Sequence, residues 1–176
     1  MTLVSHLHVT ADPLQPQRGT LRCGDMRLPC VLGRAGVRRD KHEGDGATPV
    51  GTFSLRHVLY RADRVSLPPT HLNATPIARD DGWCDDPADA SYNKPVKLPY
   101  AASAEHMWRD DRMYDVVVVL GHNDDPIVPG NGSALFMHIA SEDGTPTAGC
   151  IALTPDDFLR VLQSVSASSV LEVQSA

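Results

Sequence analysis

Short apolar segments with a period of two residues recur along the chain, separated by turns. This period is typical of β-strands that bury one face. Residues 114–120 are apolar on both faces, as expected for a central strand covered on two sides. Gly24 and Asp25 stand between two such segments and favour a hairpin turn. We therefore expect strands over residues 3–10, 20–23, 26–32, 52–60, 114–120 and 169–173.

The period changes to that of a helix after Thr154. This residue is suited to cap a helix that begins at Pro155, and Asp157 completes a capping-box pattern. The apolar stripe of this helix consists of Phe158, Leu159, Leu162 and Val165. A second short helix is expected over residues 103–108.

Residues 61–100 are rich in proline and show little periodicity. Such a stretch is long for a compact domain, and such stretches commonly form binding loops or lids. No repeat and no linker divides the chain, so we expect a single domain over residues 1–176. The fold class predicted by the pattern is mainly β with α/β character, with two layers and one or two helices packed on them.

Composition narrows the class of partner. The 176 residues include 41% hydrophobic positions, and 22 acidic against 16 basic residues give a formal net charge of −6. Nucleic-acid binding usually needs a basic patch, so we expect no nucleic-acid partner. No apolar run reaches the ~20 residues of a membrane span, and polar residues interrupt any signal-peptide core in the first 30 positions. The oligomeric state does not follow from the sequence.

Neither a disulfide nor a metal site is expected. The chain has four cysteines, without a CxxC pair, and eight histidines, without an HExxH pair. If the turn at Gly24 and Asp25 is two residues long, Cys23 pairs with Met26 and Cys30 is out of register for a bridge. Because the chain has no CxxC and no HExxH pair, we expect no metal, and we expect no cofactor either.

The candidate chemistry lies in residues 136–153. Phe136 to Ile139 is predicted to end a strand with His138 on the same face as Phe136, and residues 140–148 have the composition of a loop. Gly149 and Cys150 follow this loop. Thiol catalysis requires a thiolate, a base and backbone donors for an oxyanion, and this order of residues can supply all three. The alternative is a buried structural cysteine.

This segment resembles the catalytic signature of the YkuD-type L,D-transpeptidases, which cross-link peptidoglycan through a cysteine acyl-enzyme. The signature pairs a strand-end histidine with a downstream Ser/Thr–x–Gly–Cys, here Thr147 to Cys150. Residues 48–53 resemble the family's Thr-Pro-x-Gly-x-Phe element, and residues 82–87, 92–93 and 132–138 resemble one branch of the family. The resemblance implies the family's β-sandwich catalytic fold with one or two short helices, sensitivity to carbapenems, and stem peptides as substrates.

By this resemblance, Cys150 is the nucleophile and His138 is its base, with the carbonyl of Ile139 fixing the imidazole tautomer. Backbone amides of Gly149 and Cys150 are expected to stabilise the oxyanion. Thr147 is expected either to position His138 or substrate, or to stabilise the loop. Arg61 and Arg64 are candidates to pair with substrate carboxylates, although surface arginines are common. The remaining candidates for substrate contact, which also suit packing roles, are Trp83, Tyr92, Asn93, His122 and Asn123.

The sequence also departs from the family pattern. Only 12 positions separate His138 from Cys150, and Ala148 and Ala152 replace polar residues that are common in the family. Two specificities stay open: the family's usual diaminopimelate-to-diaminopimelate cross-link, and, if the reshaped pocket moves the attacked carbonyl to L-alanine, an alanine-to-diaminopimelate cross-link. Three functions stay open: transpeptidase, cysteine carboxypeptidase or amidase, and a catalytically silent module that binds wall peptides. Wall chemistry implies a periplasmic location.

Overall fold

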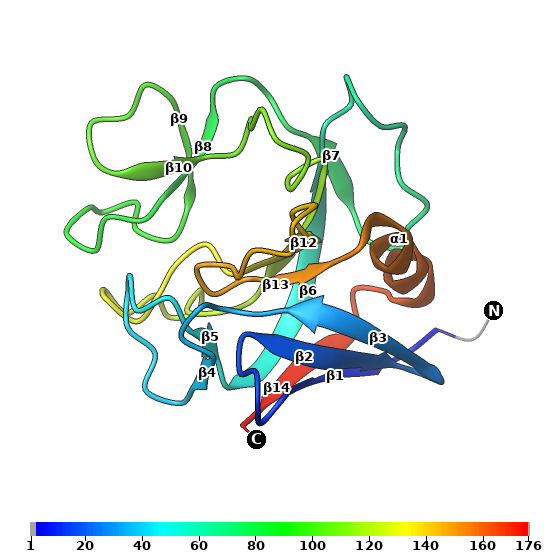
Figure 1. The fold of residues 1–176 in the computed structure, drawn as a ribbon. Coiled ribbons are helices and arrows are strands. Elements are labelled where there is room, and N and C mark those ends of the chain that lie inside the picture. The colour runs from blue at the N-terminus through cyan, green and yellow to red at the C-terminus, as the bar shows by residue number, and fades with distance from the viewer. Residues whose placement is uncertain (1–2, 176) are drawn as a thin grey trace.

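The computed structural model describes residues 3–175, which form short strands and one helix (Figure 1). The elements are β1 (His6–Ala11), β2 (Arg18–Cys23), β3 (Met26–Val31), β4 (Val37–Arg38), β5 (Thr48–Pro49), β6 (Gly51–Tyr60), β7 (Ala74–Pro76), β8 (Asp81–Cys84), β9 (Pro95–Lys97), β10 (Ala104–His106), β11 (Val116–Leu120), β12 (Phe136–Ile139), β13 (Ile151–Leu153), α1 (Pro155–Ser164) and β14 (Val170–Gln174).

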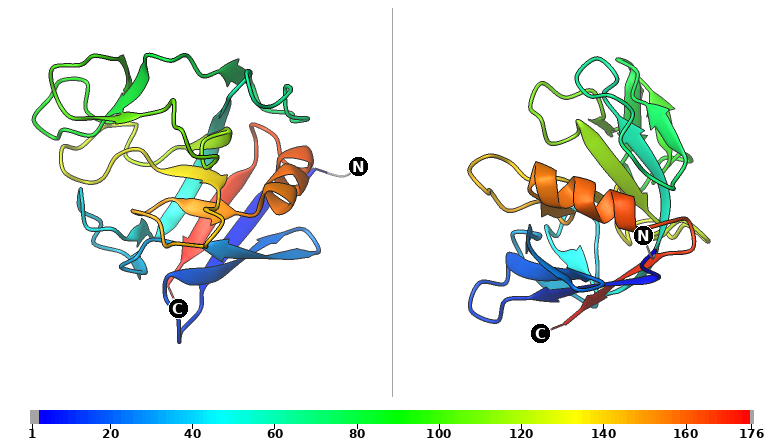
Figure 2. Two further views of the ribbon diagram at one scale, coloured as in Figure 1. Left: turned by 45° about the horizontal axis from the view of Figure 1, so that its top comes forward. Right: turned by 90° about the vertical axis from the view of Figure 1, so that its right-hand side faces the viewer.

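The main sheet closes on itself. Its strand order is β11-β12-β13-β3-β2-β1-β14-β6-β7, and β6 also pairs with β11, so eight of the nine strands form a ring. The contact between β13 and β3 is a single residue pair, Ala152 with Val31. The helix α1 packs against the ring, and its buried side chains form part of the core that the ring encloses (Figure 2). The predicted mainly β, sandwich-like fold with a short helix is confirmed.

The strands β11 and β12 separate two apolar cores. Val116 and Val118 on β11 and Met137 on β12 point into the first core, together with side chains of α1. The opposite face carries Val117 and Phe136, which pack in a second core under the small sheet β10-β8-β9. Figure 1 shows this small sheet as a separate layer above β12 and β13. The space between the main and small sheets is therefore lined by one face of β12.

The predicted two-residue hairpin turn and the predicted helix start are confirmed. The hairpin β2–β3 has a two-residue turn with Cys23 opposite Met26, Gly24 has φ +58°, and the cysteines of the described chain are all free. The helix begins at Pro155, and the Thr154 hydroxyl accepts a hydrogen bond from the amide of Asp157 at 3.4 Å. No helix within residues 3–175 has the length and hydropathy needed to span a bilayer.

The helix predicted over residues 103–108 is wrong. Residues 104–106 form β10, which pairs antiparallel with β8 so that Glu105 lies opposite Trp83. Pairing with a partner strand outweighs local helix propensity in a segment this short. The supposedly irregular residues 61–100 supply that partner, because they contain β7, β8 and β9.

The contribution of α1 to the core can be tested by paired substitutions. Phe158 is fully buried whereas its neighbour Leu159 is 37% exposed. We expect Phe158→Ala to lower the free energy of unfolding by about 3–5 kcal/mol, because it leaves a cavity in the core. Leu159→Ala should change it by less than about 1 kcal/mol. Urea unfolding followed by circular dichroism measures both, and equal losses would mean that α1 does not pack as described.

Candidate active site

The pairing of β12 with β13 positions the cysteine. The two strands run parallel, with Met137 opposite Ile151, so Cys150 lies beside Phe136 at the start of β13. The Cys150 Sγ accepts a hydrogen bond from the amide of Phe136 and donates one to the carbonyl of Ala134, each at 3.4 Å. His138 follows Phe136 by two residues, so its side chain points to the same face. The strand register thus brings the predicted nucleophile and base to one side of the sheet.

Both residues line a single cavity of about 630 Å³. Its lining mixes apolar and polar side chains, and the polar ones include Lys41, Glu43, Asp85, Glu105, Arg109, Tyr114, His122, Ser133 and Thr147. Part of the lining comes from the nucleophile loop (residues 140–149) and part from the segment between β4 and β5. A volume of this size accommodates a short peptide segment rather than a single small ion.

His138 is held in one orientation. Its ring is buried, with 4% exposure, and its Nδ1 lies 2.8 Å from the carbonyl of Ile139. Because a carbonyl accepts a hydrogen bond, Nδ1 carries the proton and Nε2 has a free lone pair. The Tyr114 ring packs edge-on against the imidazole, with centroids 5.3 Å apart. Burial lowers the pKa of His138 to about 4, so the ring is a neutral potential base at pH 7.

The thiol is neutral as well. Burial, reinforced by the negative charge of Glu105, raises the pKa of Cys150 to about 12. Within residues 3–175, the hydrogen bonds of Sγ are those with Phe136 and Ala134, and none joins it to His138. The structure therefore contains a neutral pair and not a thiolate–imidazolium ion pair. Sγ must leave the Ala134 carbonyl before His138 can take its proton.

The expected role of the Gly149 amide needs correction. This amide donates to the Thr147 hydroxyl at 3.1 Å, so it is engaged within the loop instead of pointing at a ligand. The same hydroxyl donates to the carbonyl of Cys150 at 2.6 Å. Thr147 thus stabilises the loop around the nucleophile, the second of its two predicted roles, and forms no hydrogen bond with His138 within the described chain. The Cys150 amide stays the predicted oxyanion donor.

Asn93 and Trp83 are buried under the cavity and do not line it. Asn93 Oδ1 accepts from the Trp83 indole and from the amide of Ala134, both at 3.0 Å. Its Nδ2 donates to the carbonyls of His122 and Asn123 at 3.0 and 2.8 Å. All four hydrogen bonds of this amide are satisfied by protein, which argues against the predicted substrate contact. Asn93 instead fixes Ala134, whose carbonyl contacts Cys150.

Tyr92 and Asn123 have similar supporting roles. The buried Tyr92 hydroxyl donates to Glu43 and accepts from the amide of Gly132 at 3.0 Å. Asn123 binds the backbone of Val128 and Gly132 and so closes the loop that precedes β12. His122 does line the cavity, as expected of a substrate-contacting residue, and its Nε2 lies 3.0 Å from a backbone carbonyl of the same loop.

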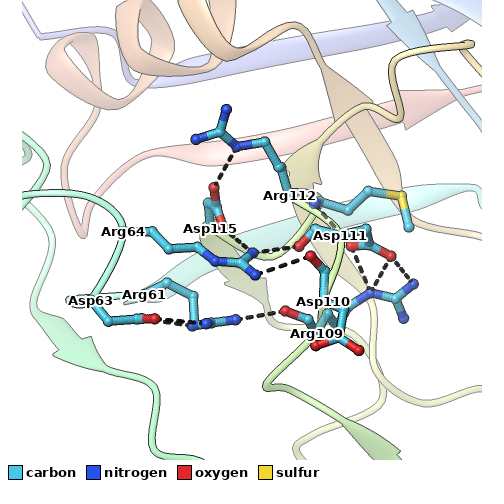
Figure 3. A network of polar contacts seen from close by, with 9 residues as sticks. Arg61, Asp63, Arg64, Arg109, Asp110, Asp111, Arg112 and Asp115 are labelled. Carbon is cyan, nitrogen blue, oxygen red and sulfur yellow. Dashed lines mark hydrogen bonds and ion pairs between the residues drawn. The ribbon is translucent and has the colours of Figure 1, made fainter.

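The arginines predicted to bind carboxylates do not line the cavity, and Figure 3 shows both of them in a network of polar contacts within the protein. Arg61 is buried, pairs with Asp63, and lies 3.5 Å from the centroid of the Trp108 ring. Arg64 pairs with the buried Asp115 at 2.9 Å. Both guanidinium groups also donate to backbone carbonyls of residues 109–111, so they anchor that loop to the end of β6. Substrate binding by Arg61 is therefore not supported.

The sequence reasoning missed several cavity residues, among them Lys41, Glu105, Arg109 and Tyr114. Glu105 fell inside the segment wrongly predicted as a helix. For Tyr114 the pattern was misleading, because the residue is in phase with Val116 of the main core but packs in the other core. Lys41 forms an ion pair with Asp45 just before the Thr-Pro element. Within residues 3–175, no group of three or more His, Cys, Asp or Glu side chains is arranged to hold a metal.

The sequence matches the family of the L,D-transpeptidase catalytic domain (YkuD) over residues 17–173. The chain belongs to this family. A comparison with curated proteins gives no match.

Several solved L,D-transpeptidases are similar in structure. Mycobacterium tuberculosis L,D-transpeptidase 1 is 15% identical with a TM-score of 0.41, and the match covers 97% of this chain and 62% of that one. An L,D-transpeptidase from Mycobacterium smegmatis is 16% identical with a TM-score of 0.42, over 96% and 58%. Mycobacterium tuberculosis L,D-transpeptidase 3, in complex with a faropenem-derived adduct, is 14% identical with a TM-score of 0.41, over 96% and 60%. The chain thus spans less than two thirds of the length of these structures.

The neutral state of the thiol predicts the pH dependence of its alkylation. Because the pKa of Cys150 is raised, the thiolate appears only as pH rises toward that value. The rate of alkylation by iodoacetamide should therefore increase by about tenfold per pH unit between pH 7 and 9. Peptide mapping by mass spectrometry separates Cys150 from the other three cysteines. A rate that is constant over this range would instead indicate a thiolate–imidazolium ion pair in the free protein.

The close approach of the loop at Gly149 predicts a second effect. Gly149 has φ +143°, and a Cβ there would lie 2.8 Å from the carbonyl oxygen of Ala47. Gly44 also has a positive φ, +74°, but a Cβ there meets no atom within 4 Å. Each substitution by alanine costs about 1–2 kcal/mol for the backbone conformation, and Gly149→Ala adds the clash. Thermal unfolding should show the larger loss for Gly149→Ala, and equal losses would contradict this contact.

Proposed function

We propose that this protein cross-links peptidoglycan stem peptides through an acyl-enzyme on Cys150. The observation that carries the proposal is the placement of Cys150 and His138 in one cavity, with Nδ1 of His138 bound to Ile139. This leaves Nε2 as a base facing the same space as the thiol. Membership in the L,D-transpeptidase family supports the same reaction class.

In the first half-reaction, Sγ attacks a carbonyl of the donor stem while His138 Nε2 takes the thiol proton. The Ile139 carbonyl stabilises the imidazolium that forms, because its hydrogen bond to Nδ1 favours the charged ring. The backbone amide of Cys150 is the proposed donor to the oxyanion. His138 then gives its proton to the departing amine, and the terminal residue of the stem leaves. The product is a thioester on Cys150.

In the second half-reaction, an amine of diaminopimelate on another stem attacks the thioester. Attack by water on the same thioester gives a carboxypeptidase, which is the alternative function. The two activities share every step up to the acyl-enzyme. The binding-module alternative requires loss of this chemistry, and the presence of both His138 and Cys150 argues against it. Because wall peptides are the proposed substrates, we propose a periplasmic location.

The position of the attacked carbonyl is a further part of the proposal. Ala148 and Ala152 both line the cavity, on either side of Cys150. Two methyl groups provide no charged contact to the donor, so the stem can lie deeper or shallower than in a pocket with polar groups there. This observation favours, as a second candidate, attack at L-alanine of the donor with formation of an alanine-to-diaminopimelate bond.

The test uses purified disaccharide tetrapeptides and mass spectrometry of the products. We expect cross-linked dimers with the wild-type protein and none with Cys150→Ala, because no thioester forms without the thiol. Cys84→Ala, which removes a buried thiol outside the cavity, should retain activity. A carbapenem should add its mass to Cys150 only. Shortened monomers without dimers would indicate the hydrolase, and labelling of another cysteine would exclude Cys150 as the nucleophile.

Tandem mass spectrometry of the dimers identifies the bond. Fragments with alanine joined to diaminopimelate would support the displaced donor position. If only diaminopimelate-to-diaminopimelate bonds occur, the two alanines do not alter the choice of carbonyl.

A further inference from the structure

Glu105 lies on the wall of the cavity formed by the small sheet. It sits on β10 opposite Trp83 of β8, and Trp83 packs edge-on against Phe136 with centroids 5.2 Å apart. The Phe136 amide is one of the two groups that hold the Cys150 thiol. Glu105 therefore faces the nucleophile from the opposite layer, within the same cavity.

A single side chain connects Glu105 to the catalytic pair. The Tyr114 hydroxyl donates a hydrogen bond to Oε1 of Glu105, and the Tyr114 ring packs edge-on against both His138 and Phe136. In the described part of the chain, Oε2 of Glu105 forms no hydrogen bond, and it is not among the buried unpartnered atoms. The carboxylate of this cavity-lining residue is thus fixed at one oxygen, and its other oxygen is not fully buried.

The surrounding charges do not neutralise Glu105. Arg109, whose positive charge lowers the pKa of Glu105, is itself bound by Asp111 at 2.6 Å, and Lys41 is paired with Asp45. Among the cavity acids, Glu43 is bound by the hydroxyls of Tyr92 and Ser133. Within residues 3–175, Glu105 has no ion pair. Asp85, which also lines the cavity, likewise has no ion pair in this part of the chain, but its Oδ1 is buried without a hydrogen-bond partner, whereas Glu105 accepts a hydrogen bond from Tyr114.

Burial raises the pKa of Glu105, with the negative charge of Asp85 adding to the shift and the Tyr114 hydrogen bond opposing it. A carboxyl group with a raised pKa is a stronger base than a solvated one. The proposed reaction has a step that needs such a group besides His138. The acceptor amine is an ammonium ion at neutral pH, with a usual pKa of about 10.4 for a lysine-like amine, and it must lose a proton before it can attack.

We propose that Glu105 binds the ammonium group of the acyl acceptor and takes its proton. This inference rests on the proposed function and extends it to the second half-reaction. The carboxylate receives one proton from the ammonium ion. The neutral nitrogen attacks the thioester carbonyl, its C–N bond forms, and the C–S bond breaks. Its second proton passes through His138 to the departing Cys150 sulfur, which regenerates the thiol. Water needs no such anchor, so hydrolysis does not depend on Glu105 in this way.

The test compares Glu105→Gln with Glu142→Gln. Glutamine keeps the size of the side chain and an oxygen that can accept from Tyr114, but it removes the charge and the basic site. Glu142 is an exposed acid on the nucleophile loop that does not line the cavity, so it controls for loss of one negative charge nearby. The rate of reaction with imipenem measures acylation of Cys150 separately from the second half-reaction. Disaccharide tetrapeptides then measure the ratio of dimer to hydrolysed monomer.

We expect Glu105→Gln to react with imipenem within about twofold of the wild-type rate while its dimer-to-hydrolysis ratio falls by about 100-fold, the size of a typical general-base contribution. The difference between Glu105→Gln and wild type in the dimer-to-hydrolysis ratio should shrink as the pH approaches ~10, where the acceptor is largely a free amine. Glu142→Gln should behave as wild type in both assays. This pH-dependent recovery separates a role in amine deprotonation from a purely structural one.

Two results would overturn the inference while leaving the proposed function intact. One is an unchanged product ratio in Glu105→Gln, and the other is an equal loss of imipenem acylation and cross-linking, which would mean that Glu105 supports the site through Tyr114. If the wild-type protein forms no adduct on Cys150, the proposed function fails, and this inference fails with it.

Discussion

The parallel pairing of β12 with β13 is the constraint on which the site depends. It sets Cys150 beside Phe136 and so places the thiol two residues from His138 along the neighbouring strand. Register in a sheet is not adjustable in small steps, since a slip by one residue turns every side chain to the other face. Such a slip would direct His138 into the main core and Met137 into the cavity. The closed ring of strands, with side chains of α1 in its core, keeps this register in place.

Burial then determines the resting chemistry. A cavity that removes the thiol and the imidazole from water disfavours both charged forms, which is why the pKa values of Cys150 and His138 move apart and not toward each other. In the proposed reaction, proton transfer from the Cys150 thiol to the His138 imidazole becomes favourable only when a bound carbonyl and the oxyanion donors share the negative charge that develops. The bond from Sγ to the Ala134 carbonyl fits this state, because it holds a neutral thiol without exposing a thiolate to solvent. The free enzyme is thus protected from side reactions by the same burial that the reaction must overcome.

The sequence predicted the parts that depend on local chemistry. The two-residue turn at Gly24, the cap at Thr154, and the strand that presents His138 all follow from residues that are neighbours in the chain. Features that depend on distant partners escaped prediction. β10 forms because it pairs with β8. Arg61 forms an ion pair with Asp63 and packs on the Trp108 ring, so its guanidinium group is already bound within the protein. Likewise, the Gly149 amide finds the Thr147 hydroxyl two residues away, a contact that depends on the exact loop conformation.

The two walls of the cavity are held by different interactions: backbone pairing on one side and side-chain hydrogen bonds on the other. The wall that carries Cys150 and His138 belongs to the closed sheet, where backbone pairing fixes every position. The facing wall consists of the small sheet and its loops, which are joined to the loop before β12 by side chains such as Asn93 and Tyr92. Because those side chains bind backbone atoms, residues at the cavity surface can change without disturbing the joint. Substitutions on that wall can therefore change the shape and charge of the cavity while the geometry of the thiol and imidazole stays the same.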